Sequence, residues 1–281
     1  MKKFMGFINT NSKENSAKVN LYYEDYGNGQ PIILIHGWPL SHRMWDTQIE
    51  ILVEAGFRVI AYDRRGFGQS SKPFSGYDYN TMTRDLKDLI QVLNLKKVIL
   101  CGFSMGGGEV ARYIGKYGTT NVDKAILISA VTPFLKKTED NKNAVDESVF
   151  QGMRGGIEKD RAGFFKDFGK NFVSYDELKD RVSLAQVELN WNIAMQASRK
   201  ATLDCVDSFG LTDFREDLKA FDIPTLIIHG DSDRIVPFEV SGKKAHKLIK
   251  NSELAIIKNG PHGLTFTHAN ELNSSILSFI K

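Results

Sequence analysis

The sequence has little of several features that mark particular classes of protein. Its 281 residues include only two cysteines, Cys101 and Cys205, which are too few for a disulfide framework. Cys101 falls in an apolar run and Cys205 lies far away in a polar-flanked segment, so we expect both to be reduced thiols. The histidines are scattered and neither cysteine has a partner nearby, so the sequence predicts no metal site.

Excess charge and long apolar runs are also missing. The net charge of +3 is small and dispersed along the chain, so we expect no nucleic-acid partner and no attraction to an anionic membrane. No apolar run approaches the length of a membrane span. Residues 1–8 begin with basic side chains but lack the apolar core and small-residue cleavage site of a secretory signal. We therefore expect a cytoplasmic protein.

The most informative segment that is present covers residues 97–108. A short apolar run reaches Gly102, presents Ser104 and continues through Gly106 into a helical pattern. Gly-x-Ser-x-Gly alone is a weak signal, but between a strand and a helix it predicts a nucleophile elbow that exposes the serine hydroxyl. A phosphate-binding loop is disfavoured, because no Gly-Lys-Ser/Thr follows and no acid sits at the dinucleotide spacing. Ser104 is therefore predicted to be a nucleophile.

Strand-like and helix-like patterns alternate along most of the chain. The near-continuous apolar runs predict a mostly parallel, doubly wound sheet covered by helices on both faces. Strands are expected at residues 18–24, 31–36, 58–62, 97–101, 125–129, 224–229 and 253–258, and helices near 44–55, 79–93, 105–117, 240–249 and 267–280.

One interval, residues 132–215, contains no strand pattern. It holds eight of the 18 phenylalanines, including Phe134, together with helical patterns. We interpret it as an inserted helical cap with its own small core, which also supplies an apolar pocket. Residues 1–131 and 216–281 would then form the core that carries the sheet.

A serine nucleophile on such a sheet needs a base and an acid, which follow it in the order serine, acid, histidine. His262 lies in a loop just past the last predicted strand and is expected to be the general base. His36 and His229 lie at the ends of predicted strands, and we expect them to hold the framework by hydrogen bonds rather than to act as the base. The loop after residue 229 offers two acids. We favour Asp233, which has room to reach His262, and expect Asp231 to cap the turn.

The negative charge of a tetrahedral intermediate requires backbone donors. One is the amide of Met105, which directly follows the nucleophile. The second is expected from the loop after residues 31–36, where Gly37 permits close approach and Trp38 presents its amide, with Pro39 holding Trp38 extended. We expect Phe103, Pro39, Phe134 and Ile235 to line the substrate pocket.

With these residues in place, the chain resembles the cofactor-free bacterial haloperoxidases of the α/β-hydrolase fold, also called perhydrolases or aryl esterases. The likeness runs from about residue 5 to the C-terminus and is looser between 135 and 211. The matching segments are residues 21–25, 36–40, 62–70, 102–106, 212–215 and 255–263. The resemblance places the nucleophile on Ser104, the base on His262, the acid on Asp233 and the oxyanion donors on Trp38 and Met105.

This resemblance implies a serine esterase that needs no metal, haem or other cofactor and commonly forms homo-oligomers. Its substrates would be a small ester, or a carboxylic acid together with hydrogen peroxide. The aspartate that haloalkane dehalogenases and epoxide hydrolases need at the nucleophile position is replaced here by Ser104. Two alternatives stay open: an amidase or lactamase on the same triad, and a small-molecule sensor on a hydrolase fold with poor turnover.

Overall fold

A computed structural model describes residues 3–10 and 19–281, and it places a single twisted sheet at the centre of these residues. The eight strands lie in the order β1-β2-β4-β3-β5-β6-β7-β8. β3 to β8 run parallel, whereas β2 is antiparallel to β4 and β1 is antiparallel to β2. Their bounds are β1 Lys3–Asn9, β2 Asn20–Gly27, β3 Pro31–Ile35, β4 Arg58–Tyr62, β5 Val98–Phe103, β6 Val122–Ile128, β7 Thr225–Gly230 and β8 Ser252–Ile257.

The predicted strands correspond to β2 through β8, so the mostly parallel sheet is confirmed. Lys18 of the first expected strand lies outside the described residues. β1 was missed. It pairs along the open edge of β2 and exposes Phe4, Met5 and Phe7, so it lacks the continuous burial that made the central strands recognisable.

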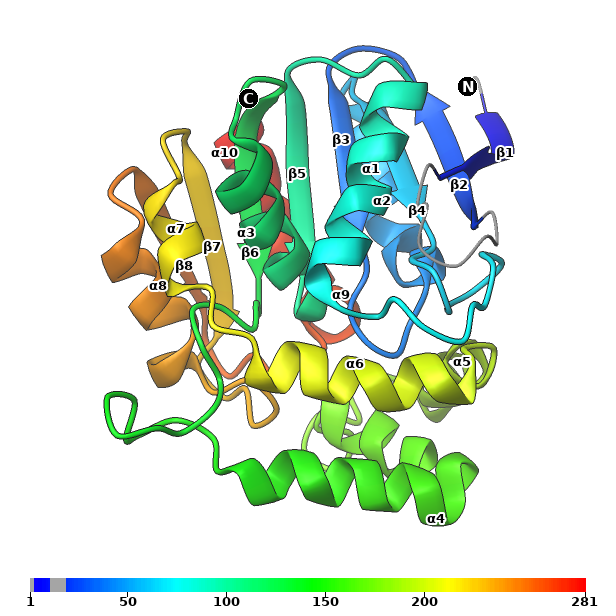
Figure 1. The fold of residues 1–281 in the computed structure, drawn as a ribbon, viewed down its shortest axis with the longest axis vertical. Coiled ribbons are helices and arrows are strands. Elements are labelled where there is room, and N and C mark those ends of the chain that lie inside the picture. Colours follow the sequence, from blue (N-terminus) through cyan, green and yellow to red (C-terminus); the bar gives the residue numbers. More distant parts are fainter. Residues whose placement is uncertain (1–2, 11–18) are drawn as a thin grey trace.

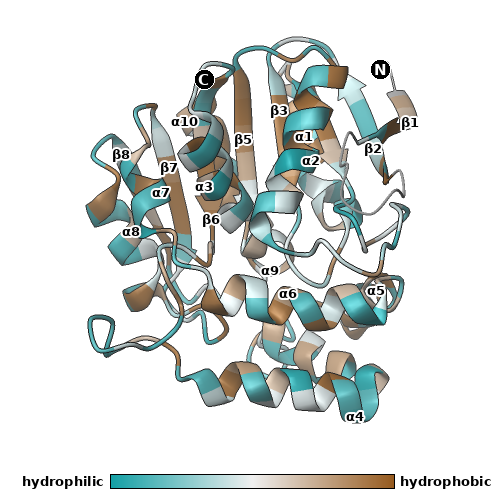
Figure 2. Ribbon diagram, in the orientation of Figure 1, coloured by the Kyte–Doolittle hydropathy of each residue, from teal (hydrophilic) through white to brown (hydrophobic). Residues whose placement is uncertain are grey.

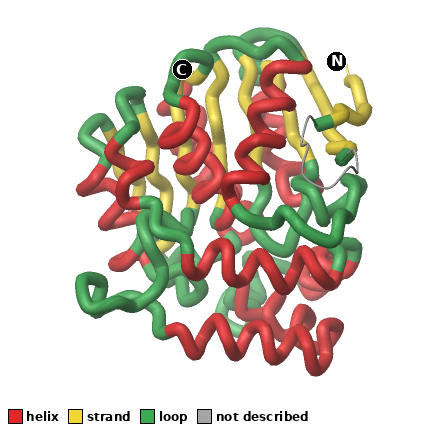
Figure 3. Tube along the Cα trace, viewed as in Figure 1, coloured by secondary structure: helices red, strands yellow, loops and turns green. Residues whose placement is uncertain are grey.

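Helices cover both faces of the sheet (Figure 1), as the doubly wound pattern predicted. Residues of α1 and α10 share a buried cluster with one face, and residues of α2, α3, α7 and α8 share a cluster with the other. Figure 3 shows the strands side by side between these helices. The bounds are α1 Asp46–Glu54, α2 Tyr79–Val92, α3 Met105–Tyr117, α7 Arg215–Lys219, α8 Gly242–Leu248, α9 Leu264–Thr267 and α10 Ala269–Ile280, with short 3₁₀ helices at His42–Trp45 and Phe238–Val240.

Hydrophobic burial explains why the middle strands form the core. Every residue of β5 and β7 is buried, and Figure 2 shows the hydrophobic colour running along β5. Because strands of a parallel sheet are covered on both faces, their side chains are apolar in both directions. None of the helices in the described part of the chain is long and apolar enough to cross a membrane.

Of the four helices between β6 and β7, three stack beyond one end of the sheet (Figure 1). They are α4 Glu147–Phe172, which kinks at Asp160, α5 Leu184–Met195 and α6 Arg199–Leu211. Their aromatic residues pack onto the core through Trp38, whose ring contacts Phe165, Phe168 and Phe209 at centroid distances of 5.3–5.4 Å. The Trp38 indole N–H also donates to the carbonyl of Thr202 at 3.1 Å. These helices therefore cover the loops that follow β3.

Candidate active site

Ser104 occupies the sharp turn between β5 and α3. Its backbone has φ 54° and ψ −118°, a conformation that L-residues rarely adopt. The backbone on both sides of Ser104 is closely packed. A Cβ atom on Gly102 would lie 2.4 Å from the carbonyl oxygen of Gly106, and a Cβ atom on Gly106 would lie 2.2 Å from the carbonyl oxygen of Ile35. The two glycines of the motif are thus required by close backbone approach. The turn presents the hydroxyl of Ser104, a residue that is 6% exposed, at the carboxyl edge of the sheet.

His262 and Asp233 meet this hydroxyl from the loops after β8 and β7. The Nε2 atom of His262 lies 2.9 Å from Ser104 Oγ, and its Nδ1 lies 2.7 Å from Asp233 Oδ2. Burial alone would raise the pKa of the Asp233 carboxyl, but the facing His262, and then His229, hold that pKa well below its usual range. Asp233 is therefore ionised and accepts a hydrogen bond from the Nδ1–H group of His262, which leaves Nε2 free to accept the serine proton.

The two acids of the β7 loop do different things. Asp233 is buried, and its Oδ1 accepts hydrogen bonds from the amides of Ile235 and Val236 at 2.9 and 2.8 Å, which fixes the carboxylate. Asp231 is exposed, and its Oδ1 accepts from the amide of Asn259 at 2.7 Å. Asp231 thus ties the β7 loop to the β8 loop, whereas it was expected to cap its own turn by bonding local amides.

The backbone around Ser104 offers two candidate oxyanion donors. Met105 is the first residue of α3, and the first N–H groups of a helix have no carbonyl partner within the helix. On the other side, a Cβ on Gly37 would lie 3.2 Å from Ser104 Cβ, so the loop after β3 passes directly beside the nucleophile. Trp38 follows at this point and is joined to Pro39 by a cis peptide bond.

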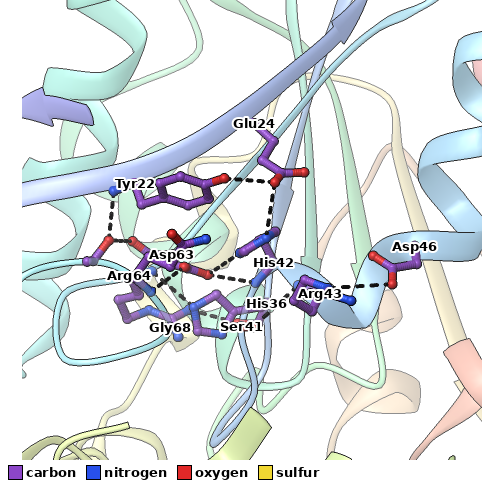
Figure 4. A network of polar contacts seen from close by, with 12 residues as sticks. Tyr22, Glu24, His36, Ser41, His42, Arg43, Asp46, Asp63, Arg64 and Gly68 are labelled. Atoms are coloured by element: carbon purple, nitrogen blue, oxygen red, sulfur yellow. Dashed lines mark hydrogen bonds and ion pairs between the residues drawn. The ribbon is translucent and has the colours of Figure 1, made fainter. Parts of the chain in front are cut away.

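The loop that carries Trp38 is held by a buried polar network (Figure 4). Both the backbone N–H and the ring Nδ1 of His42 bond to Asp63 Oδ1, at 2.8 and 2.7 Å. His36 Nε2 accepts from the amide of Arg64 at 3.0 Å, and the Arg64 guanidinium donates to the carbonyl of His36 at 2.9 Å. Sequence reasoning missed His42 and Asp63 as supports of the site. Asp63 lies in segment 62–70, which was used only as a mark of resemblance, and His42 lies just beyond segment 36–40.

His36 and His229 are framework residues, as expected. Burial, and then the charge of Arg64, lower the pKa of His36 to about 3, so its ring is neutral and its Nδ1 donates to the carbonyl of Gly37. His229 Nε2 donates to the carbonyl of Val236 at 2.8 Å and lies 3.3 Å from Asp233 Oδ2. His229 therefore helps to position the candidate acid. Both cysteines are free thiols, as predicted, and both are buried.

A small apolar cavity of about 40 Å³ lies beside Ser104 and His262. Of the four residues expected in the pocket, Ile235 lines this cavity and Pro39 lines a neighbouring one. Phe103 and Phe134 do not line it. The Phe103 ring is fully buried and packs 5.0 Å from the His262 ring, and Phe134 lies under the guanidinium of Arg215. Phe150, Phe168 and Phe209 come from the interval that was expected to supply an apolar pocket. The rest of the lining comprises Trp38, Val131, Leu135, Val145, Val149, Met153 and Val236.

Activity is expected to survive exhaustive treatment with a chelator. Within residues 3–10 and 19–281, no group of three histidine, cysteine, aspartate or glutamate side chains could hold a metal ion. The chemistry is assigned to protein groups alone, so the rate of ester hydrolysis should be the same before and after dialysis against EDTA. Loss of activity that added metal ions restore would contradict this assignment.

Comparisons with known proteins show the family to which the chain belongs. The family model of the α/β-hydrolase fold matches residues 30–269. A non-heme chloroperoxidase of Kitasatospora aureofaciens is 40% identical, over 93% of this chain and 96% of its own. A bifunctional esterase/perhydrolase of Acinetobacter calcoaceticus is 38% identical over 99% of this chain and all of its own. The crystal structure of a bromoperoxidase from Bacillus anthracis is 51% identical and superposes with a TM-score of 0.94, covering 99% of both chains.

The fold and the site therefore define an α/β-hydrolase, and the chain belongs to that family. Within it, the chain belongs to the non-heme haloperoxidases and perhydrolases, which it matches along nearly its whole length.

Proposed function

We propose that this protein is a serine esterase of small carboxylic esters, in which hydrogen peroxide can replace water in the second half of the reaction. The observation that carries the proposal is the continuous hydrogen-bonded series Asp233–His262–Ser104, with distances of 2.7 and 2.9 Å. A nucleophile, a base and a group that orients the base are the minimum set for acyl transfer. The relatives called chloroperoxidase and esterase/perhydrolase support it.

In the first half-reaction, Ser104 Oγ attacks the ester carbonyl carbon while its proton passes to His262 Nε2. The carbonyl oxygen becomes negative and is stabilised by the amides of Trp38 and Met105. The carbon–oxygen bond to the alcohol then breaks, and His262 returns the proton to the leaving alcohol. An acyl group remains on Ser104, and Asp233 stabilises the imidazolium between these proton transfers.

In the second half-reaction, water or hydrogen peroxide attacks the acyl-enzyme. His262 removes the proton of the incoming oxygen, and Ser104 leaves as the alcohol after receiving that proton. Water yields a carboxylic acid and hydrogen peroxide yields a peracid. A peracid can oxidise a halide ion to hypohalous acid and is itself reduced to the carboxylic acid. Halide oxidation then needs no haem or metal.

With the Phe168 ring in the position that the structure shows, the size of the cavity beside Ser104 favours short acyl groups. A volume of about 40 Å³ is space for about three water-sized groups. Its lining is mainly aliphatic and aromatic, so a short apolar acyl chain gains burial there and a charged one does not. Aryl acetates are therefore the substrates of choice for a first assay.

Replacing Pro39 with alanine is expected to lower peracid formation several-fold more than ester hydrolysis. Pro39 restricts the backbone of Trp38, whose carbonyl can accept a hydrogen bond from the additional hydroxyl of hydrogen peroxide. One such bond is worth about 1 kcal/mol, which limits the bias to several-fold. The measurement is the rate of peracid formation from acetate and peroxide at mildly acidic pH, beside aryl acetate hydrolysis. An equal fall in both rates would show that Pro39 serves only the shared oxyanion geometry.

We also propose that residues 132–215 act as the cap of a core formed by residues 1–131 and 216–281. We further propose that the protein works in the cytoplasm as a homo-oligomer. The helices between β6 and β7 and the aromatic contacts of Trp38 support the first point. The homo-oligomer is supported by the resemblance to a family that commonly forms oligomers. Phe4, Met5 and Phe7 are exposed on edge strand β1 and offer an apolar surface for contact between chains. Light scattering that gives the mass of a single chain would exclude the oligomer.

A further inference from the structure

Three hollows follow one another from Ser104 to the outer surface of the helices α4 and α5. The cavity beside Ser104 is bounded by Phe168, which also lines a second cavity of about 20 Å³. Trp191 lines this second cavity and also an open groove of about 450 Å³ between α4 and α5. Phe168 thus lies between the two inner cavities, and Trp191 lies between the second cavity and the open groove.

The second cavity contains a buried amide group with an unused donor. Asn190, on α5, is 4% exposed and lines this cavity. Its Oδ1 accepts a hydrogen bond of 3.0 Å from Gln186 Nε2, and the amide oxygen therefore lies toward Gln186. The Nδ2 group has no hydrogen-bond partner among the described residues.

The rest of the lining offers this donor no acceptor side chain. It comprises Pro39, Leu40, Phe165, Phe168, Gly169, Phe172, Trp191 and Ala194. Trp191 is the one other side chain with a polar atom, and its N–H already donates to the carbonyl of Ala162 at 2.9 Å. A buried N–H group without an acceptor is costly and rare in proteins. A site that keeps one in an apolar cavity favours a ligand that brings its own acceptor oxygen.

We propose that Asn190 forms a second subsite, which binds a carbonyl oxygen at the far end of the substrate while Ser104 attacks the near one. This inference rests on the proposed esterase function and specifies its substrate class: esters that carry a second, neutral carbonyl group, such as diesters. The Phe168 ring must turn aside for one molecule to reach both cavities. Its position between them makes it the residue that limits substrate length.

The test compares substrates that differ only in the second carbonyl. The kcat/KM values of dimethyl esters from succinate to suberate are measured beside methyl monoesters of matched chain length. The wild-type protein is expected to favour the diester at one chain length. In Asn190→Leu, which keeps the side chain's approximate size, that preference should fall roughly three- to tenfold. Asn171→Leu, the same change at an exposed position of α4, should keep it.

Phe168→Ala gives an independent arm, because it joins the two inner cavities. In this variant, kcat/KM should rise more for the long dimethyl esters than for dimethyl succinate. If the wild-type protein has the same kcat/KM for each diester and its matched monoester, the subsite proposal is overturned, whatever the variants do. An Asn190→Leu variant that folds, by circular dichroism, and keeps the full diester preference would also overturn it. Absence of hydrolysis of any ester would instead refute the proposed function, so the two failures are distinguishable.

Discussion

Replacing Ser104 with alanine is expected to reduce aryl acetate hydrolysis by about 10⁴-fold or more. The variant loses the oxygen that forms the acyl-enzyme, whereas the oxyanion donors and the cavity remain. Only the residual catalysis that these supply should persist. The substitution removes one partly buried atom and leaves the glycines of the turn in place, so the fold should be retained. Initial rates at saturating and subsaturating ester measure the loss.

Two comparisons make this result decisive. Ser232→Ala, which removes a serine hydroxyl from an exposed loop position, should keep the wild-type rate. The time course of the wild-type protein separates an enzyme from a sensor, because a sensor with poor turnover would give a single burst or no product. A purified, folded Ser104→Ala protein with wild-type turnover would refute the proposed chemistry.

Asp233→Asn is expected to lower turnover by about 10³- to 10⁴-fold while the protein stays folded. The asparagine has one oxygen where the carboxylate has two, and its neutral side chain no longer stabilises the imidazolium. Asp233 Oδ1 is already committed to the amides of Ile235 and Val236. The remaining position then presents an NH₂ group to His262, which favours the wrong tautomer. Steady-state rates and circular dichroism together measure the effect.

Asp231→Asn is the matched control for this change. The Asp231 carboxylate accepts from the amide of Asn259 at the surface. Its loss should therefore change stability by about 1 kcal/mol and leave turnover nearly intact. If Asp231→Asn abolished turnover and Asp233→Asn only lowered the melting temperature, the acid would have been assigned to the wrong carboxylate.

The sequence was sufficient for the parts of the structure that local patterns specify. Largely buried strands give continuous apolar runs, so β3 to β7 were recognised, and the edge strand β8 was predicted too although it is only partly buried. The Gly-x-Ser-x-Gly turn was placed because strand and helix signals flank it. β1 was missed because its exposed Phe4, Met5 and Phe7 do not follow a buried-strand pattern. Its position depends on pairing with β2, which is a tertiary effect.

The candidate site was predictable in its chemistry but only partly in its lining. Ser104, Asp233 and His262 follow strand ends in a fixed order, so topology alone brings them to one edge. The cavity lining depends on how α4 and α6 fold back over that edge. Residues such as Phe150 and Phe209 therefore carry no local signal that marks them. Phe103 was misplaced because its side chain points into the core beside His262, whereas the next residue along the turn faces the cavity.

The most direct test of the account is covalent labelling of the nucleophile. Diethyl p-nitrophenyl phosphate should transfer its diethylphosphoryl group to Ser104 Oγ and release nitrophenolate. Mass spectrometry should find one such group per chain, on the peptide that contains Ser104, and activity should fall in proportion to the labelled fraction. Full activity in protein labelled at Ser104, or inactivation with the label on another residue, would contradict the assignment of Ser104 as the nucleophile.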